Sequence, residues 1–175
     1  WDMAATLADT PRSGVVTFWK KDKFKYVTHH QLDQRILITI LQDDDGTKWT
    51  IINAHFHNDA APRKQQWEKI LAALPKQRQG YVVMLADHNS VLDAARDQHP
   101  PAEVEPSHKV KAREKEQAAY VELQLLDAWP LVYEAELGDP ESKGLTREHR
   151  RIDRASVSAT LAPAISGLYN VDVGS

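Results

Sequence analysis

The segment Tyr81-Val-Val-Met-Leu-Ala-Asp-His-Asn-Ser90 guides the interpretation of the whole chain. Its apolar half, which follows a glycine, predicts a buried strand, and an acid, an imidazole and an amide end that strand. In an extended backbone Asp87 and Asn89 point to one face and His88 to the other. A carboxylate and a carboxamide on one face suit a hard cation, a water molecule or a phosphate oxygen. The alternative is an ordinary strand end, where such residues make local hydrogen bonds in a turn.

Length and composition restrict the class of protein. At 175 residues the chain has the size of one domain with a sizeable core, so we expect residues 1–175 to form a single domain. The net charge of −3 gives no global attraction to nucleic acid, so a phosphate-binding surface would have to be local. The absence of cysteine excludes disulfides and zinc–thiolate sites. With no membrane-length apolar run and no signal-peptide pattern, we expect no membrane partner and favour an intracellular location.

Strand patterns lie on both sides of the opening segment. Two strong strands are separated by an Asp-Gly turn, which predicts a hairpin. The expected strands are residues 15–19, 24–28, 35–42, 48–55, 81–85, 150–158 and 168–173, and the expected loops include 93–106 and 138–144.

Two helices are predicted between the strands. Residues 62–74 place Trp67, Ile70, Leu71 and Leu74 on one apolar face. A second helix over about 107–127 is charged first and apolar later, at Ala118, Val121, Leu125 and Trp129. Its charged run is interpreted as a solvated face or, alternatively, as a phosphate patch; the run comprises Lys109, Lys111, Arg113, Glu114, Lys115 and Glu116. This mixture of elements predicts the α/β (α+β) class with mixed or antiparallel sheets.

Other candidate residues lie at strand and helix ends. Asn53, His55 and His57 alternate and therefore share a face, where the histidines could ligate zinc if a third ligand joined them, or could face a phosphate. Arg63 lies in the first turn of a helix, and helix N-termini favour anions. Asp153, within a β-forming segment, would most often pair with a nearby arginine. No phosphate-binding glycine loop, dinucleotide fingerprint or Gly-x-Ser-x-Gly elbow is present.

In this order the segments resemble the endonuclease/exonuclease/phosphatase superfamily, which has the DNase I-like fold, and most of all the endonuclease domains of non-LTR retrotransposons. The family patterns are Gly-Gly-Val-Ala, Asn-x-Tyr-x-Pro-Asn, Gly-Asp-Phe-Asn, Leu-x-Asp-x-Trp, Tyr-Thr-Trp and Arg-Ile-Asp. The matching segments are Ser13-Gly-Val-Val-Thr-Phe18, Trp49-Thr-Ile-Ile-Asn-Ala-His-Phe-His-Asn58, Val83-Met-Leu-Ala-Asp-His-Asn-Ser-Val-Leu92, Leu125-Leu-Asp-Ala-Trp129, Gly144-Leu-Thr146 and Arg150-Arg-Ile-Asp-Arg-Ala-Ser-Val-Ser158.

The resemblance implies a two-layer β-sandwich of mixed sheets flanked by helices, and phosphoester hydrolysis assisted by Mg²⁺ or Mn²⁺. Asp87 would position or deprotonate the attacking water and contribute to the metal site, and Asn89 would hold the scissile phosphate. His55 would steady the developing phosphorane charge, and Asp153 would orient the family's catalytic histidine. The implied substrate phosphate-binding residues are Arg63, Asn58 and Arg151.

The sequence departs from the family pattern in several places. The family's first asparagine and its metal-binding glutamate lie upstream of Trp1, and its Ser-Asp-His segment lies beyond Ser175, so we expect the central part of the fold, truncated at both ends. His88 stands in place of the usual phenylalanine, and either it or His149 could substitute for the catalytic histidine. Sheet edges left open by such truncation predict a homodimer or edge-strand pairing.

Together these observations favour a metal-dependent, retroelement-derived endonuclease acting on nucleic acid, with DNA favoured over RNA. Two alternatives stay open. The chain could be a catalytically inactive remnant that acts as a binding or interaction module, or it could be a phosphatase of the same superfamily.

Overall fold

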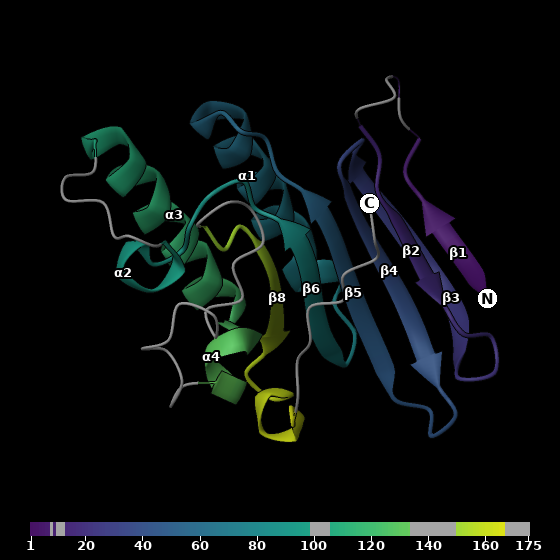
Figure 1. The fold of residues 1–175 in the computed structure, drawn as a ribbon. Coiled ribbons are helices and arrows are strands. Elements are labelled where there is room, and N and C mark those ends of the chain that lie inside the picture. Colours follow the sequence, from purple (N-terminus) through teal and green to yellow (C-terminus); the bar gives the residue numbers. More distant parts are fainter. Residues whose placement is uncertain (8, 10–12, 99–105, 134–149, 167–175) are drawn as a thin grey trace, which may run out of the picture.

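A six-stranded sheet forms the centre of the computed structural model, which describes residues 1–7, 9, 13–98, 106–133 and 150–166 (Figure 1). Neighbouring strands follow the order β3–β4–β5–β6–β8–β7. Within the described residues β5–β6 is the parallel pair of this sheet, and the other pairs are antiparallel. The strands are β3 (Phe24–Asp33), β4 (Ile36–Asp43), β5 (Lys48–His55), β6 (Tyr81–Asp87), β7 (Leu125–Asp127) and β8 (Asp153–Ser158).

β4 is buried on both faces, which explains its uninterrupted apolar sequence. Ile36 and Ile38 belong to the core cluster on the helical side, whereas Leu37 and Leu41 belong to a cluster on the other side. The predicted hairpin between β4 and β5 is confirmed, and Gly46 in its turn has a left-handed φ of 83°.

A two-stranded antiparallel ribbon, β1 (Asp2–Ala5) and β2 (Val16–Trp19), lies over β4 and β5. Ala4 and Trp19 of the ribbon pack against the second face of β4. The Asn53 side chain donates a 2.7 Å hydrogen bond to the Val16 carbonyl and so ties the two layers together. The expected two-layer arrangement is therefore formed by one mixed sheet and one antiparallel ribbon.

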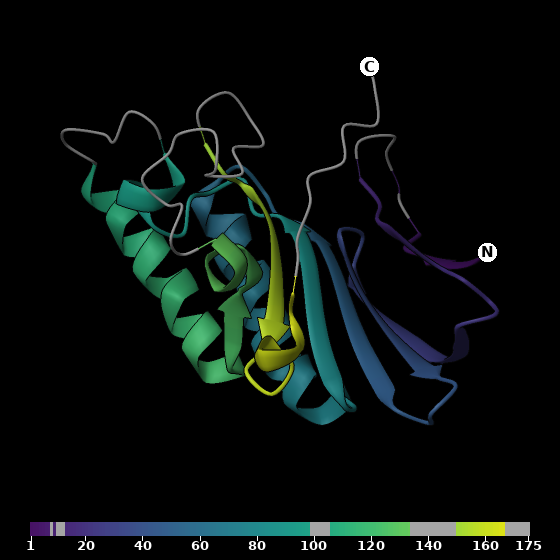
Figure 2. The same ribbon diagram turned by 60° about the horizontal axis from the view of Figure 1, so that its bottom comes forward.

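Helices cover the opposite face of the large sheet. α1 (Ala60–Gln77) and α3 (Ser107–Leu123) pack side by side there (Figure 2). As predicted, Trp67, Ile70 and Leu74 of α1 are buried. The remaining helices are short: α2 (Ala94–Asp97), α4 (Ala128–Tyr133) and a 3₁₀ turn over Ala162–Ala164. No helix in the described part of the chain is both long and apolar enough to span a membrane.

The prediction for the second helix was wrong at its C-terminal end and on its buried face. Gln124 takes a left-handed conformation and ends α3, and the next three residues form β7. Val121 is 79% exposed, while Glu116 and Tyr120 are buried. Hydrophobic periodicity alone missed this face because a glutamate lies at its centre.

The other helices and strands differ less from the elements expected from the sequence. β1 and α2 were not predicted, and β3 is longer than the expected strand over residues 24–28. β6 extends to Asp87, so the acid is the last residue of the strand itself. The expected loop over 138–144, the expected strand over 168–173 and His149 lie outside the described residues.

Candidate active site

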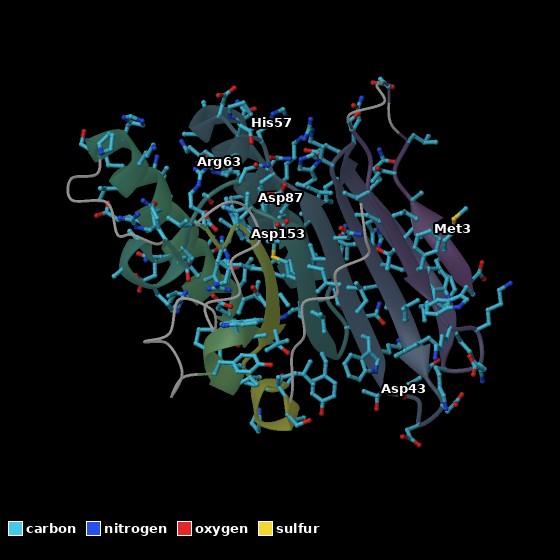
Figure 3. All side chains as sticks on the ribbon, viewed as in Figure 1. Met3, Asp43, His57, Arg63, Asp87 and Asp153 are labelled. Atoms are coloured by element: carbon cyan, nitrogen blue, oxygen red, sulfur yellow. The ribbon has the colours of Figure 1, made fainter. Side chains whose placement is uncertain are left out.

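Three predicted residues form a row across neighbouring strands at one edge of the large sheet. His55 is the register partner of Asp87 in the parallel β5–β6 pair, and Asp87 is the register partner of Asp153 in the antiparallel β6–β8 pair. The carboxyl ends of parallel strands meet at one edge, and an antiparallel neighbour contributes its amino end there. Nε2 of His55 lies 3.9 Å from Oδ2 of Asp87. Figure 3 shows Asp87 and Asp153 close together at this edge.

Arg35 is a member of the site that sequence reasoning missed. Its Nη1 lies 3.2 Å from Nδ1 and 3.4 Å from Nε2 of His55, and its carbonyl accepts the His55 backbone N–H at 2.9 Å. Burial first and the Arg35 cation second lower the pKa of His55, and the Asp87 carboxylate only partly opposes them. The imidazole is therefore neutral at neutral pH. The hairpin register carried the missing signal: since Ile36 pairs with Ala54, Arg35 stands opposite His55.

Asn89 does not share a strand face with Asp87, contrary to the sequence prediction. The strand ends at Asp87, and Asn89 has a left-handed φ of 49°. The Asn89 backbone N–H donates to Oδ1 of Asp87 at 2.9 Å, which is an Asx turn, and its side-chain amide donates to the Phe56 carbonyl at 2.8 Å. The turn thus joins Asp87 to Asn89 through a hydrogen bond, with the Asn89 side chain placed over the end of β5.

Hydrogen bonds from Arg63 connect this turn to the start of α1. Its Nη1 donates to the carbonyls of His57 and Asn58 at 2.9 Å and of Asn89 at 3.4 Å. Burial lowers its pKa from the ordinary arginine value. Arg63, Asn58 and Asn89 also line one cleft of about 540 Å³. Three of the predicted residues therefore gather at the cleft, next to the row on β5, β6 and β8.

Arg151 is not placed to bind a substrate phosphate, and this expectation needs correction. Its side chain is buried, and its guanidinium donates to the carboxylates of Asp97 and Asp127. Burial lowers the pKa of Arg151, but the two carboxylates outweigh burial and raise it overall. Arg151 instead joins the segment just before β8 to α2 and β7.

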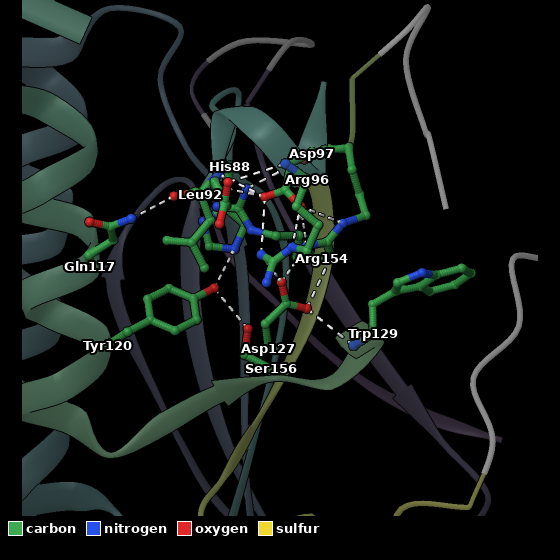
Figure 4. Close-up of polar contacts among 12 residues, drawn as sticks. His88, Leu92, Arg96, Asp97, Gln117, Tyr120, Asp127, Trp129, Arg154 and Ser156 are labelled. Carbon is green, nitrogen blue, oxygen red and sulfur yellow. Dashed lines mark hydrogen bonds and ion pairs between the residues drawn. The ribbon is translucent and has the colours of Figure 1, made fainter. Parts of the chain in front are cut away.

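A second buried charged cluster contacts the turn over residues 88–90 that follows β6, and Figure 4 shows its members His88, Tyr120 and Arg154. Glu116 of α3 pairs with Arg154 of β8, its Oε1 lies 3.0 Å from Nδ1 of His88, and its Oε2 accepts from the Ser90 hydroxyl at 2.7 Å. Arg154 also donates to the Ser90 carbonyl at 2.6 Å, and the Tyr120 hydroxyl lies 3.3 Å from Nε2 of His88. The cluster supports both ends of the turn that carries Asn89. In the sequence, Glu116 was indistinguishable from its exposed charged neighbours.

Burial excludes His88 as a substitute for a catalytic histidine at the surface. Its side chain is fully buried and stacks on Phe56, with ring centroids 5.1 Å apart. Burial first, and then Arg154, lower the pKa of His88 below its ordinary value, so the ring is neutral. Burial raises the pKa of Glu116, but Arg154 and His88 outweigh it, so this carboxylate stays ionised.

The row offers a partial ligand set for a divalent cation. Asp87 and Asp153 supply two neighbouring carboxylates, and Mg²⁺ is typically bound through one or two carboxylates together with waters and substrate phosphates. No group of three His, Cys, Asp or Glu side chains able to hold a metal occurs among the described residues, which leaves the zinc interpretation of His55 and His57 without a third ligand. The donor set therefore fits Mg²⁺ or Mn²⁺ shared with substrate better than an all-protein cage.

This sheet and its flanking helices have the architecture of the endonuclease/exonuclease/phosphatase structures, which is the DNase I-like fold. The catalytic domain of Xenopus laevis APE2 matches with a TM-score of 0.65 at 14% identity, over 92% of this chain and 67% of that one. An AP endonuclease from Archaeoglobus fulgidus matches with a TM-score of 0.61 at 15% identity, over 92% and 68%. The Neisseria 3′ phosphatase NExo, bound to a product DNA hairpin, matches with a TM-score of 0.63 at 17% identity, over 92% and 68%.

These similarities establish the fold. The chain spans about two thirds of the length of each of the three structures. No protein-family model and no curated protein matches the sequence. None of the three is a retrotransposon endonuclease, so that finer resemblance stays a prediction.

Proposed function

We propose that this chain is a metal-assisted phosphodiester hydrolase that acts on nucleic acid. The observation that carries the proposal is the row of His55, Asp87 and Asp153 on three adjacent strands of a DNase I-like sheet. The sequence resemblance to retrotransposon endonucleases and the DNA-bound Neisseria structure favour DNA as the substrate.

Each residue of the site has a role that its surroundings support. The free edge of the Asp87 carboxylate orients the attacking water, since its Oδ1 is already held by the Asn89 backbone N–H. Neutral His55 and the Arg35 cation beside it donate to charge that develops on the phosphate oxygens. Asn89 and Asn58 contact the phosphate from the cleft side, while Arg63 keeps their backbones in place. A bound Mg²⁺ would supply Lewis-acid stabilisation of the phosphate, with Asp87 and Asp153 as its protein ligands.

A plasmid-nicking assay tests the proposal. Supercoiled DNA is incubated with the chain in MgCl₂ or EDTA, and Asp87→Asn is compared with Asp44→Asn. Asp44 is a matched control because it is an exposed aspartate in the β4–β5 turn, at the opposite end of β5 from His55. We expect nicking only with Mg²⁺, a loss of about 100-fold or more in Asp87→Asn, and wild-type activity in Asp44→Asn. Equal nicking by the two variants would exclude the proposed role of the row.

A second candidate is a module that binds nucleic acid without turnover. It is favoured by the incomplete ligand set of the described residues and by the use of Arg63 Nη1 on three backbone carbonyls. DNA binding without nicking at high protein concentration would favour this candidate. Release of a 3′ phosphate from an oligonucleotide, without nicking, would favour a phosphatase instead.

A further inference from the structure

The cleft beside Asn89 is rich in basic side chains, although the chain as a whole is acidic. It lies between the N-terminal ends of α1 and α3 and extends to the start of β8. Asp59 is the one carboxylate among its described lining residues. The basic lining residues are Arg63, His108, Lys109, Arg113 and Arg150.

The charged run of α3 is divided between two surfaces. Lys109 and Arg113, four residues apart, line the cleft, whereas Lys111 and Lys115 line an adjoining, mainly apolar groove between α1 and α3. Residues four apart share one side of a helix, and residues two apart do not. The charged run of α3 is therefore not one uniform solvated face, because two of its basic residues line the cleft. These two residues contribute to a local positive surface beside Asn89.

The walls of the cleft suit a strand better than an isolated anion. Val91 and Ala112 add apolar surface between the cations, which can contact sugars or base edges. The first turns of two long helices also face it, and their backbone amides favour negative charge. A small phosphomonoester held at the Asp87 row would leave this volume of about 540 Å³ unfilled.

We propose that this cleft is a second phosphate-binding subsite, which holds the backbone of a nucleic-acid strand next to the phosphate at the Asp87 row. The inference rests on the proposed function and adds a contact with the nucleic-acid strand beside the phosphate at the row. Lys109 and Arg113 contact backbone phosphates there, and the Arg63–Asn89 hydrogen bond joins the subsite to the row.

Binding measured in EDTA tests the subsite independently of hydrolysis. A fluorescein-labelled DNA oligonucleotide is titrated with wild type, with Lys109→Gln/Arg113→Gln, and with Lys111→Gln/Lys115→Gln. The two double variants change net charge equally and lie on the same helix. We expect the cleft variant to weaken binding about tenfold or more and to reduce the slope of log affinity against log salt by about 2, with little change in the control. Circular dichroism checks that both variants keep the wild-type fold.

Competitors identify the ligand class. An unlabelled oligonucleotide should displace the probe at far lower concentration than inorganic phosphate does. Equal loss of binding in the two double variants would reduce the effect to overall charge and overturn the subsite. Absence of oligonucleotide binding, or equally effective displacement by inorganic phosphate, would also overturn it. Binding that depends on the cleft in a chain that never nicks DNA would keep the subsite and reject the hydrolase.

Discussion

Asp87 and Asp153 are register partners on β6 and β8, so two carboxylates stand side by side at the edge of the sheet. Like charges at directly opposite positions of a sheet repel each other. A bound divalent cation would replace this repulsion by two attractive contacts.

Mg²⁺ should stabilise the folded chain through this pair. A ligand that binds only the native state at 100 times its dissociation constant adds about 2.7 kcal/mol to the free energy of unfolding. We expect thermal denaturation to show a higher Tm in MgCl₂ than in EDTA for wild type and for Asp44→Asn. Asp87→Asn and Asp153→Asn should each lose most of the increase. An identical Mg²⁺ response in all four proteins would contradict metal binding at the pair.

Removing the Arg35 cation should raise the pKa of His55. Burial and Arg35 lower this pKa, and Asp87 raises it, so Arg35→Gln removes a lowering influence and Asp87→Asn a raising one. The midpoint of the NMR titration of the His55 imidazole C–H signals should therefore lie at higher pH in Arg35→Gln and at lower pH in Asp87→Asn than in wild type. Arg78→Gln, at the exposed end of α1, is the control and should leave the His55 titration unchanged. A downward shift in Arg35→Gln would show that the contact seen here does not control the imidazole.

Stability should fall as the pH drops below 6.5, partly because of His88. Its pKa is lowered in the folded chain, so the unfolded chain binds a proton first, near the ordinary value of 6.5. The contribution of neutral His88 to the free energy of unfolding is complete above pH 6.5 and is lost on acidification. The slope of that free energy against pH is at most about 1.4 kcal/mol per pH unit for one proton. His88→Phe keeps an aromatic ring stacked on Phe56. In this variant the free energy of unfolding, measured by urea denaturation, should depend less on pH between pH 5 and 6.5 than in wild type. The slope left in that variant is expected from His55, and an unchanged slope would reject the role of His88.

Breaking the Arg151 cluster should be strongly destabilising. Removing one member of a buried ion pair typically costs about 3–5 kcal/mol. Arg151→Met removes one partner of the buried Asp97 and Asp127 carboxylates, and Arg96 still pairs with both, so we expect a loss near the lower end of that range. Lys64→Met removes the exposed Lys64–Glu68 pair at 3.3 Å, for which about 0–1 kcal/mol is expected. Urea denaturation at pH 7 measures both. Similar losses in the two variants would contradict the structural role of Arg151.

Residues near strand ends were predictable where local patterns point to one edge. His55 ends a β-forming segment and Asp87 follows a continuous apolar run, so each was expected at a strand end, and the two strands are neighbours in the sheet. Arg35 could have been found by extending the hairpin register one residue further. Asn89 could not be placed, because the backbone leaves the strand after Asp87 and turns into the left-handed region.

The amino-acid sequence by itself determined the mixed α/β class, the hairpin, the buried face of α1 and the position of Asp87 at the end of its strand. These features depend on periodicity and turn chemistry within about twenty residues. Only the tertiary structure decided which charges are buried. Glu116, Arg154 and His88 come from three distant segments, and the desolvation of each is tolerated only because the others neutralise it or hydrogen-bond to it. The same packing removed Arg151 from the surface and turned Lys109 and Arg113 toward the cleft, since the exposure of a charge depends on what the rest of the chain places against it.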